Sequence, residues 1–227
     1  MTHLIIASFK MNQGFNEGNN PGNPMIAPKG IAFSIWFLIF ICLLIWCVRP
    51  LRNHREDQEL VKSIGLWFPV CIFFTGTSVL VGEPFSILFI VLGLLTLMLI
   101  YTRITKSPGH SKWMKFPFSI FIGWLSLATV VDAFVVIQSQ GITTLFGLAE
   151  QAWTNIILTA TIIIGISFTY FHKDWIFATV FCWSYFWIIF NGETRFPQQF
   201  IAGLGILLLA TAIIIIIRNK HFKKALS

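Results

Sequence analysis

Residues 116–137 form a run of twenty-two residues in which Asp132 is the one formally charged side chain. A run of this length can cross the hydrocarbon core of a bilayer as a single helix. An aspartate well inside such a helix costs about 2.5–3.5 kcal/mol on insertion scales, so it needs a structural or functional reason. Trp124, Ala128 and Asp132 follow at spacings of four, which places them within roughly 80° of one helix face. The sequence predicts a membrane helix with one face directed at a partner other than lipid.

Six further apolar segments predict an all-α polytopic bundle of about seven transmembrane helices. Composition agrees with an integral membrane protein, since 56% of residues are hydrophobic and 11% are charged,. The second and sixth segments along the chain are short, so they must recruit flanking residues or thin the bilayer. The further segments are 31–48, 66–81, 85–101, 153–171, 175–190 and 200–217.

The Lys and Arg residues set the expected orientation. If the N-terminus lies outside, the outer face holds Lys10, Lys29 and Arg195, and the other thirteen of the sixteen basic residues face the cytoplasm. This asymmetry favours an outside N-terminus and a basic cytoplasmic tail at 218–227, and we expect a bacterial plasma membrane. The net charge of +7 then reflects topology and does not indicate a nucleic-acid partner,.

Residues 1–30 are mostly polar and predict an extramembrane segment,. The apolar run 4–9 is too short for a span, and it is either the stub of a helix or part of a free N-terminal tail. The four cysteines lie in or at the ends of apolar segments without metal-ligand spacing, so we interpret them as small hydrophobic residues,. All five histidines lie outside the apolar segments, so we predict no metal site or histidine-ligated haem within the membrane.

Two kinds of residue inside the spans can carry a function. Trp36, Trp124, Trp183 and Trp187 lie well inside their segments. Their indoles either pack between helices beside a local hydrogen-bond acceptor or line a flat cavity for a planar apolar ligand. Asp132 is either a hydrogen-bonded structural acid, a relay for protons or substrate, or a polar residue in a water-filled vestibule. One acid without a paired base is thin support for acid/base catalysis, so we assign no catalytic residue.

Two stretches resemble a known family. Residues 28–40 (PKGIAFSIWFLIF) and 117–132 (PFSIFIGWLSLATVVD) are similar to the second and fifth helices of the TspO/translocator-protein family, the tryptophan-rich sensory proteins. The resemblance covers about residues 24–137 and points to a longer, divergent branch. Trp36 and Trp124 match tryptophans of the family, and Asp132 stands where the family usually has asparagine.

The resemblance implies a four-helix membrane core at 31–137. The apolar segments that follow predict three additional transmembrane helices at 138–217, which the short family lacks,. The resemblance also implies an intramembrane cavity for a hydrophobic planar ligand such as a porphyrin or a haem-related molecule. The expected ligand-binding residues are Phe33, Trp36, Trp124, Ala128 and Asp132. The sequence departs from the short family in its shortened N-terminal apolar run, in the run Pro24-Met25-Ile26-Ala27-Pro28, which replaces a Trp and Pro-Pro pattern, and in the three extra helices.

Three functions follow as hypotheses. The first is a sensory or binding protein whose partners are the lipid bilayer and a small hydrophobic ligand. The alternative is a small-molecule or proton-coupled transporter that uses Asp132. An enzyme acting on a lipid-soluble substrate is a third reading with less support. A homodimer is compatible with the sequence, which does not fix the oligomeric state.

Overall fold

The computed structural model describes residues 24–52, 55–82, 84–107, 112–142 and 144–225. Each predicted apolar segment is helical, which confirms the all-α membrane fold. Five helical stretches of the described chain are long and apolar enough to cross a membrane, and α8 is a shorter apolar helix. The helices that correspond to the apolar segments are α2 (Ile35–Val48), α4 (Trp67–Leu80), α5 (Phe85–Lys106), α6 (Lys112–Ser139), α7 (Glu150–His172), α8 (Trp175–Ile189) and α9 (Phe196–Ala225).

The described chain divides into two compact units, and the chain passes from one to the other between Ala32 and Phe33 and again between Val136 and Ile137. The first unit comprises residues 33–136 and contains α2, α4, α5 and α6. The second comprises residues 24–32 and the chain from residue 137 onward. The short 3-10 helix η1 (Gly30–Ser34) leads into α2.

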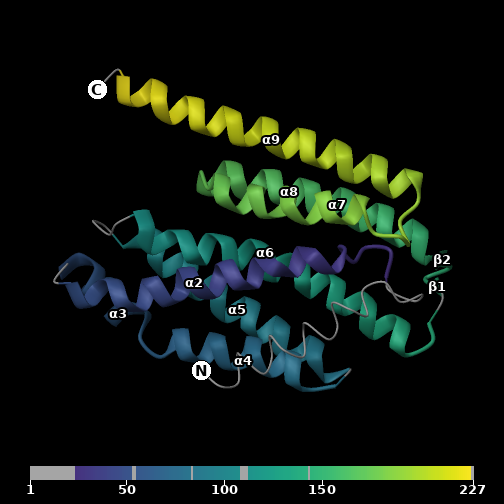
Figure 1. Ribbon diagram of the computed structural model, residues 1–227, viewed down its shortest axis with the longest axis horizontal. Coiled ribbons are helices and arrows are strands. Elements are labelled where there is room, and N and C mark those ends of the chain that lie inside the picture. The colour runs from purple at the N-terminus through teal and green to yellow at the C-terminus, as the bar shows by residue number, and fades with distance from the viewer. Residues whose placement is uncertain (1–23, 53–54, 83, 108–111, 143, 226–227) are drawn as a thin grey trace. The chain divides into compact units, whose positions relative to one another are not determined.

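In the first unit, α4 and α5 form an antiparallel hairpin (Figure 1). The two helices approach closely because Gly93 of α5 has no side chain. A Cβ atom at this position would lie 2.8 Å from Oγ1 of Thr75 on α4. The thiol of Cys71, also on α4, donates to the Gly93 carbonyl over 3.6 Å. Close contact between the two backbones at Gly93 therefore stabilises the hairpin together with apolar packing.

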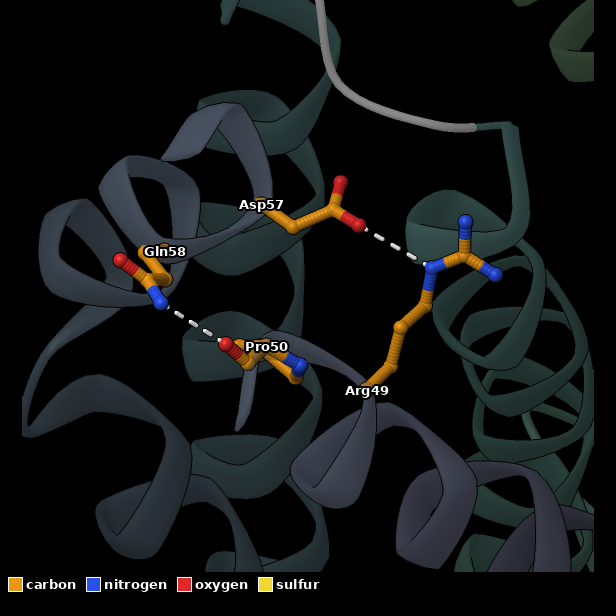
Figure 2. Close-up of polar contacts among 4 residues, drawn as sticks. All are labelled: Arg49, Pro50, Asp57 and Gln58. Carbon is orange, nitrogen blue, oxygen red and sulfur yellow. Dashed lines mark hydrogen bonds and ion pairs between the residues drawn. The ribbon is translucent and has the colours of Figure 1, made fainter. Parts of the chain in front are cut away.

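The helix α3 (Arg55–Ile64) lies in the connection between α2 and α4. Its apolar residues Leu60 and Ile64 are buried, so the connection is packed against the rest of the protein. Two polar contacts tie α3 to the preceding 3-10 turn, η2 (Arg49–Arg52). As Figure 2 shows, Arg49 Nε donates to the Asp57 carboxylate over 3.0 Å, and Gln58 Nε2 donates to the Pro50 carbonyl over 2.9 Å.

The second unit contains α7, α8 and α9, which pack against one another (Figure 1). Gly165 of α7 and Gly205 of α9 allow this close packing, because a Cβ atom at either would meet side chains of neighbouring helices at 3.2 Å or less. A short antiparallel hairpin, β1 (Thr144–Leu145) and β2 (Leu148–Ala149), precedes α7. This hairpin was not predicted from the sequence.

Candidate functional site

One face of α2 is buried within the first unit. Trp36, Ile39, Leu43 and Trp46 recur at spacings of three and four residues, and each is at most 6% exposed. By contrast, Phe37 is 71% exposed. Residues three and four apart share a helix face, so this stripe is the inward surface of α2. The sequence could not identify the stripe by polarity, because α2 (IWFLIFICLLIWCV) is apolar on all sides.

Between residues 117 and 125, α6 is buried on all sides, and its buried residues include three aromatic ones. Phe118, Phe121, Trp124 and Leu125 are at most 1% exposed. Phe118, Phe121 and Leu125 follow at spacings of three and four, and Trp124 lies beside Leu125. The sequence predicted that Trp124 faces a partner other than lipid, and this prediction is confirmed by its burial.

Aromatic rings from α2, α6 and the turn before α2 meet in one cluster. The Phe33 and Trp124 ring centroids lie 5.3 Å apart at an interplanar angle of 83°. Trp36 meets Trp124 at 6.5 Å and 85°, and it meets Phe121 at 5.7 Å and 69°. Edge-to-face pairs at these distances are favoured by the ring quadrupoles. The structure therefore brings together three predicted site residues, Phe33, Trp36 and Trp124, and adds Phe121.

Each of the two indoles in this cluster has a buried nitrogen without a partner in the described part of the chain. Nε1 of Trp36 and Nε1 of Trp124 are buried, and neither donates a hydrogen bond to any described atom of the protein. An unsatisfied buried donor costs about 1–3 kcal/mol. Of the two alternatives for the indoles, a local acceptor is found for Trp183, whose Nε1 donates to the Ala32 carbonyl over 2.9 Å. Nε1 of Trp36, of Trp124 and of Trp187 has no acceptor among the described residues. The cluster thus holds two buried donors that no described residue satisfies.

Asp132 and Ala128 lie further along α6 than the aromatic cluster. Asp132 is eight residues beyond Trp124, a rise of about 12 Å along the helix. Its carboxylate accepts a hydrogen bond of 3.1 Å from Ser86 Oγ, in the first turn of α5. Both Ala128 and Asp132 are half-buried. The α6 helix thus directs an indole to rings from α2 and the turn before it, and a carboxylate to a hydroxyl on α5.

Sequence reasoning missed a second aromatic cluster at the other end of α2. Trp46 meets Phe68 of α4 and Phe118 of α6, with each pair of ring centroids 5.1 Å apart. Its Nε1 is also buried without a partner among the described residues. The signal that could have found it is the spacing of ten residues from Trp36, which places both tryptophans within about 80° of one face.

The fold defines an integral membrane protein with several helices and with buried aromatic clusters between α2 and α6. The chain belongs to the TSPO-like protein family, whose family model matches residues 3–218. The match reaches beyond the stretch 24–137 that carried the resemblance, so it includes α7, α8 and most of α9. Searches of curated proteins and of solved structures found no match to the chain.

Proposed function

We propose that this protein is a membrane-embedded binding or sensory protein that takes a hydrophobic planar ligand of the porphyrin type. The ligand site consists of Phe33, Trp36, Trp124, Ala128 and Asp132. The observation that carries the proposal is the pair of buried indoles, Trp36 and Trp124, whose Nε1 donors have no acceptor among the described residues. Membership of the TSPO-like family supports the same reading.

The chemistry of the cluster suits a flat, largely apolar molecule with an acceptor group. Aromatic faces provide contact area for a planar ring system, and Trp and Phe dominate such surfaces because they bury large areas. Each indole N–H then donates to an electronegative atom of the ligand, which removes the cost of an unpaired donor. Asp132 and Ser86 supply a second polar pair farther along α6. A ligand that spans both groups has an apolar body and polar atoms separated along its length.

The test is a titration of the full chain in lipid nanodiscs with protoporphyrin IX, followed by tryptophan fluorescence. We expect saturable quenching, and Trp124→Phe should weaken binding by about tenfold because one hydrogen bond and part of the ring contact are lost. The matched control is Trp175→Phe, since Trp175 begins α8 and is 38% exposed. Equal titration curves for the native protein, Trp124→Phe and Trp175→Phe would remove this proposal.

A second candidate function is proton-coupled or small-molecule transport through Asp132. The observation that favours it is a half-buried carboxylate within a membrane helix, held by a hydroxyl of a neighbouring helix. Such residues in spans often belong to proton or substrate pathways. The test is uptake driven by a pH gradient in proteoliposomes. Transport requires that Asp132→Asn abolish uptake while Ser86→Ala retains part of it, and equal uptake in the native protein and Asp132→Asn excludes this function.

We also propose the orientation with the N-terminus outside a bacterial plasma membrane and the tail after α9 in the cytoplasm. It rests on the division of the Lys and Arg residues, three against thirteen of sixteen,. Protease added to sealed, right-side-out vesicles should leave an epitope at the C-terminus intact and should remove one at the N-terminus. The reverse pattern contradicts this orientation.

A further inference from the structure

The segment 24–32 belongs to the second unit, although the residue that follows it begins the first. Its residues Ile26, Ala27 and Ala32 are at most 8% exposed. Two amides are paired within the segment, that of Ala27 with the Pro24 carbonyl and that of Ala32 with the Lys29 carbonyl. Other buried backbone groups of this irregular segment need partners from elsewhere in the chain. These partners come from the C-terminal helices and their ends.

Four hydrogen bonds hold the segment along its length. Near its start, the Met25 amide donates to Glu150 Oε1, at the first residue of α7, over 2.7 Å. In the middle, Asn191 Nδ2 donates to the Ala27 carbonyl over 2.7 Å. The other two involve α8: the Lys29 amide donates to the Trp187 carbonyl over 3.1 Å, and Trp183 Nε1 donates to the Ala32 carbonyl over 2.9 Å.

One of these contacts satisfies a group that the end of a helix leaves open. Carbonyls in the last turn of a helix lack intrahelical partners, and Trp187 lies in the last turn of α8,. The Lys29 amide donates to the Trp187 carbonyl and so supplies the missing partner. Asn191 follows the end of α8 and is 6% exposed. Its buried side-chain amide donates to the Ala27 carbonyl, which lies far away in the sequence. The segment and the end of α8 thus satisfy polar groups of each other.

The last of these bonds ends one residue before the candidate ligand site. Ala32 accepts the hydrogen bond from Trp183, and the next residue, Phe33, contributes its ring to the cluster with Trp124. Ala32 and Phe33 share a peptide bond, which is rigid, so the position of the Ala32 carbonyl restricts the backbone of Phe33. Any displacement of η1 is therefore passed directly to the first aromatic residue of the site.

We propose that the C-terminal helices clamp residues 24–32, and that Glu150, Trp183 and Asn191 are positioning residues for the start of α2. The three helices after the four-helix core then have a defined task, which is to order the chain that leads into the site. The consequence for ligand affinity rests on the proposed function, whereas the ordering of residues 24–38 does not. A ligand that contacts Phe33 and Trp36 gains affinity when these residues are held in place beforehand.

The first experiment is hydrogen–deuterium exchange of the full chain in nanodiscs without ligand. In Trp183→Phe and Asn191→Asp, exchange of the amides of residues 24–38 should accelerate by about fivefold or more, the effect of losing one hydrogen bond of ordinary strength. The remainder of α8 and all of α9 should keep their native rates. Trp175→Phe is the matched control on the same helix, and its residues 24–38 should exchange as in the native protein.

Glu150 offers a conservative rescue. Glu150→Gln keeps an oxygen that accepts from the Met25 amide, so its exchange in residues 24–32 should stay near the native rate. Glu150→Ala removes the acceptor and should accelerate exchange there. Native exchange of residues 24–38 in Trp183→Phe, Asn191→Asp and Glu150→Ala overturns the proposal, and so does acceleration spread evenly over α7, α8 and α9, which would signal general destabilisation.

The second experiment measures protoporphyrin IX binding by the same variants. The clamp predicts that Trp183→Phe and Asn191→Asp weaken binding by about threefold or more, because part of the binding free energy is then used to order the segment. Faster exchange with native affinity overturns the link to the site. If the native protein does not bind the probe, the proposed function fails, and the exchange experiment still decides whether the clamp exists.

Discussion

The indole rings of Trp36 and Trp124 meet at an interplanar angle of 85° with centroids 6.5 Å apart, and both Nε1 donors are buried without an acceptor among the described residues. Edge-to-face packing contributes about 0.5–1.5 kcal/mol beyond the buried area, whereas each unpaired donor costs about 1–3 kcal/mol. The pair is therefore not optimised for stability alone. Such a conflict is typical of binding sites, where a ligand completes the hydrogen bonds.

This conflict predicts a separation between stability and binding for Trp36→Phe. The substitution removes an unpaired donor while it shrinks a packed ring, so the two effects oppose each other. We expect the free energy of unfolding to change by less than about 1 kcal/mol, while affinity for protoporphyrin IX falls by about tenfold. Thermal unfolding in detergent and the fluorescence titration measure the two quantities.

Trp183→Phe is the comparison for this prediction, because the Trp183 N–H is paired with the Ala32 carbonyl. Loss of that bond leaves a carbonyl without its partner, so Trp183→Phe should destabilise the protein more than Trp36→Phe does. A larger loss of stability in Trp36→Phe would contradict the prediction and show that the lost ring packing outweighs the relief of the unpaired donor.

A second prediction concerns Arg49 and Asp57. The Asp57 side chain is 3% exposed and that of Arg49 is 32% exposed, so the pair lies between a surface and a buried ion pair. A double-mutant cycle with Arg49→Met and Asp57→Asn should give a coupling free energy of about 2 kcal/mol, between the values for exposed and buried pairs. Lys62→Met, on the exposed side of α3, should change stability by less than about 0.5 kcal/mol. A coupling near zero would mean that the packing of α3 does not depend on this contact.

The membrane helices could be predicted because long apolar runs have few alternatives in a bilayer. The predicted ends of these helices were less accurate. The α6 helix begins at Lys112, before the predicted 116, and α9 continues to Ala225, beyond the predicted 217. Charged residues such as Lys112 continue a helix readily once it has formed, so the apolar run marks the hydrocarbon core and not the helix end.

The site could be predicted only in part. The inward position of Trp124 followed from its spacing with Asp132, but the partner of each residue did not. The Ser86 hydroxyl pairs with Asp132 across two helices, and no local pattern encodes that contact. The same holds for Asn191 and Ala27, since an irregular segment carries no periodicity that points to a distant partner. The sequence therefore did not predict the tertiary contacts of single polar groups.

A third prediction concerns the turn of the β-hairpin. Phe146 has φ of 51° and Gly147 has φ of 76°, so both central residues adopt the left-handed conformation. Asn-Gly is the preferred pair at such turns, and a bulky residue there is strained by about 1–2 kcal/mol. Because the Phe146 side chain is 87% exposed, Phe146→Asn loses little packing and should raise stability by about 0.5–1 kcal/mol,. Thermal unfolding in detergent measures it, and a lower stability would show that the contact of the phenyl ring with Trp153, at a centroid distance of 6.3 Å, outweighs the backbone strain.

A final pair of variants tests the packing of the C-terminal helices. A Cβ atom at Gly205 would lie 2.8 Å from Ile162 Cδ1 and 2.9 Å from Tyr185 Cε2. The Ile162 methyl can rotate away, but the Tyr185 ring is fixed by its hydroxyl, which donates to Thr161 Oγ1 over 2.8 Å.

Gly205→Ala should therefore destabilise the protein by about 1–3 kcal/mol, the usual cost of overpacking. Gly203→Ala lies on the same helix with nothing within 4 Å of its Cβ position, so it should be neutral or should stabilise by up to about 1 kcal/mol through helix propensity,. Thermal unfolding of both variants separates the two contributions, because propensity is common to them and the contact is not. If both variants gain stability equally, α9 does not approach α7 and α8 as closely as its Gly205 backbone indicates. The helices that are proposed to hold residues 24–32, α8 and the start of α7, would then themselves be packed less tightly.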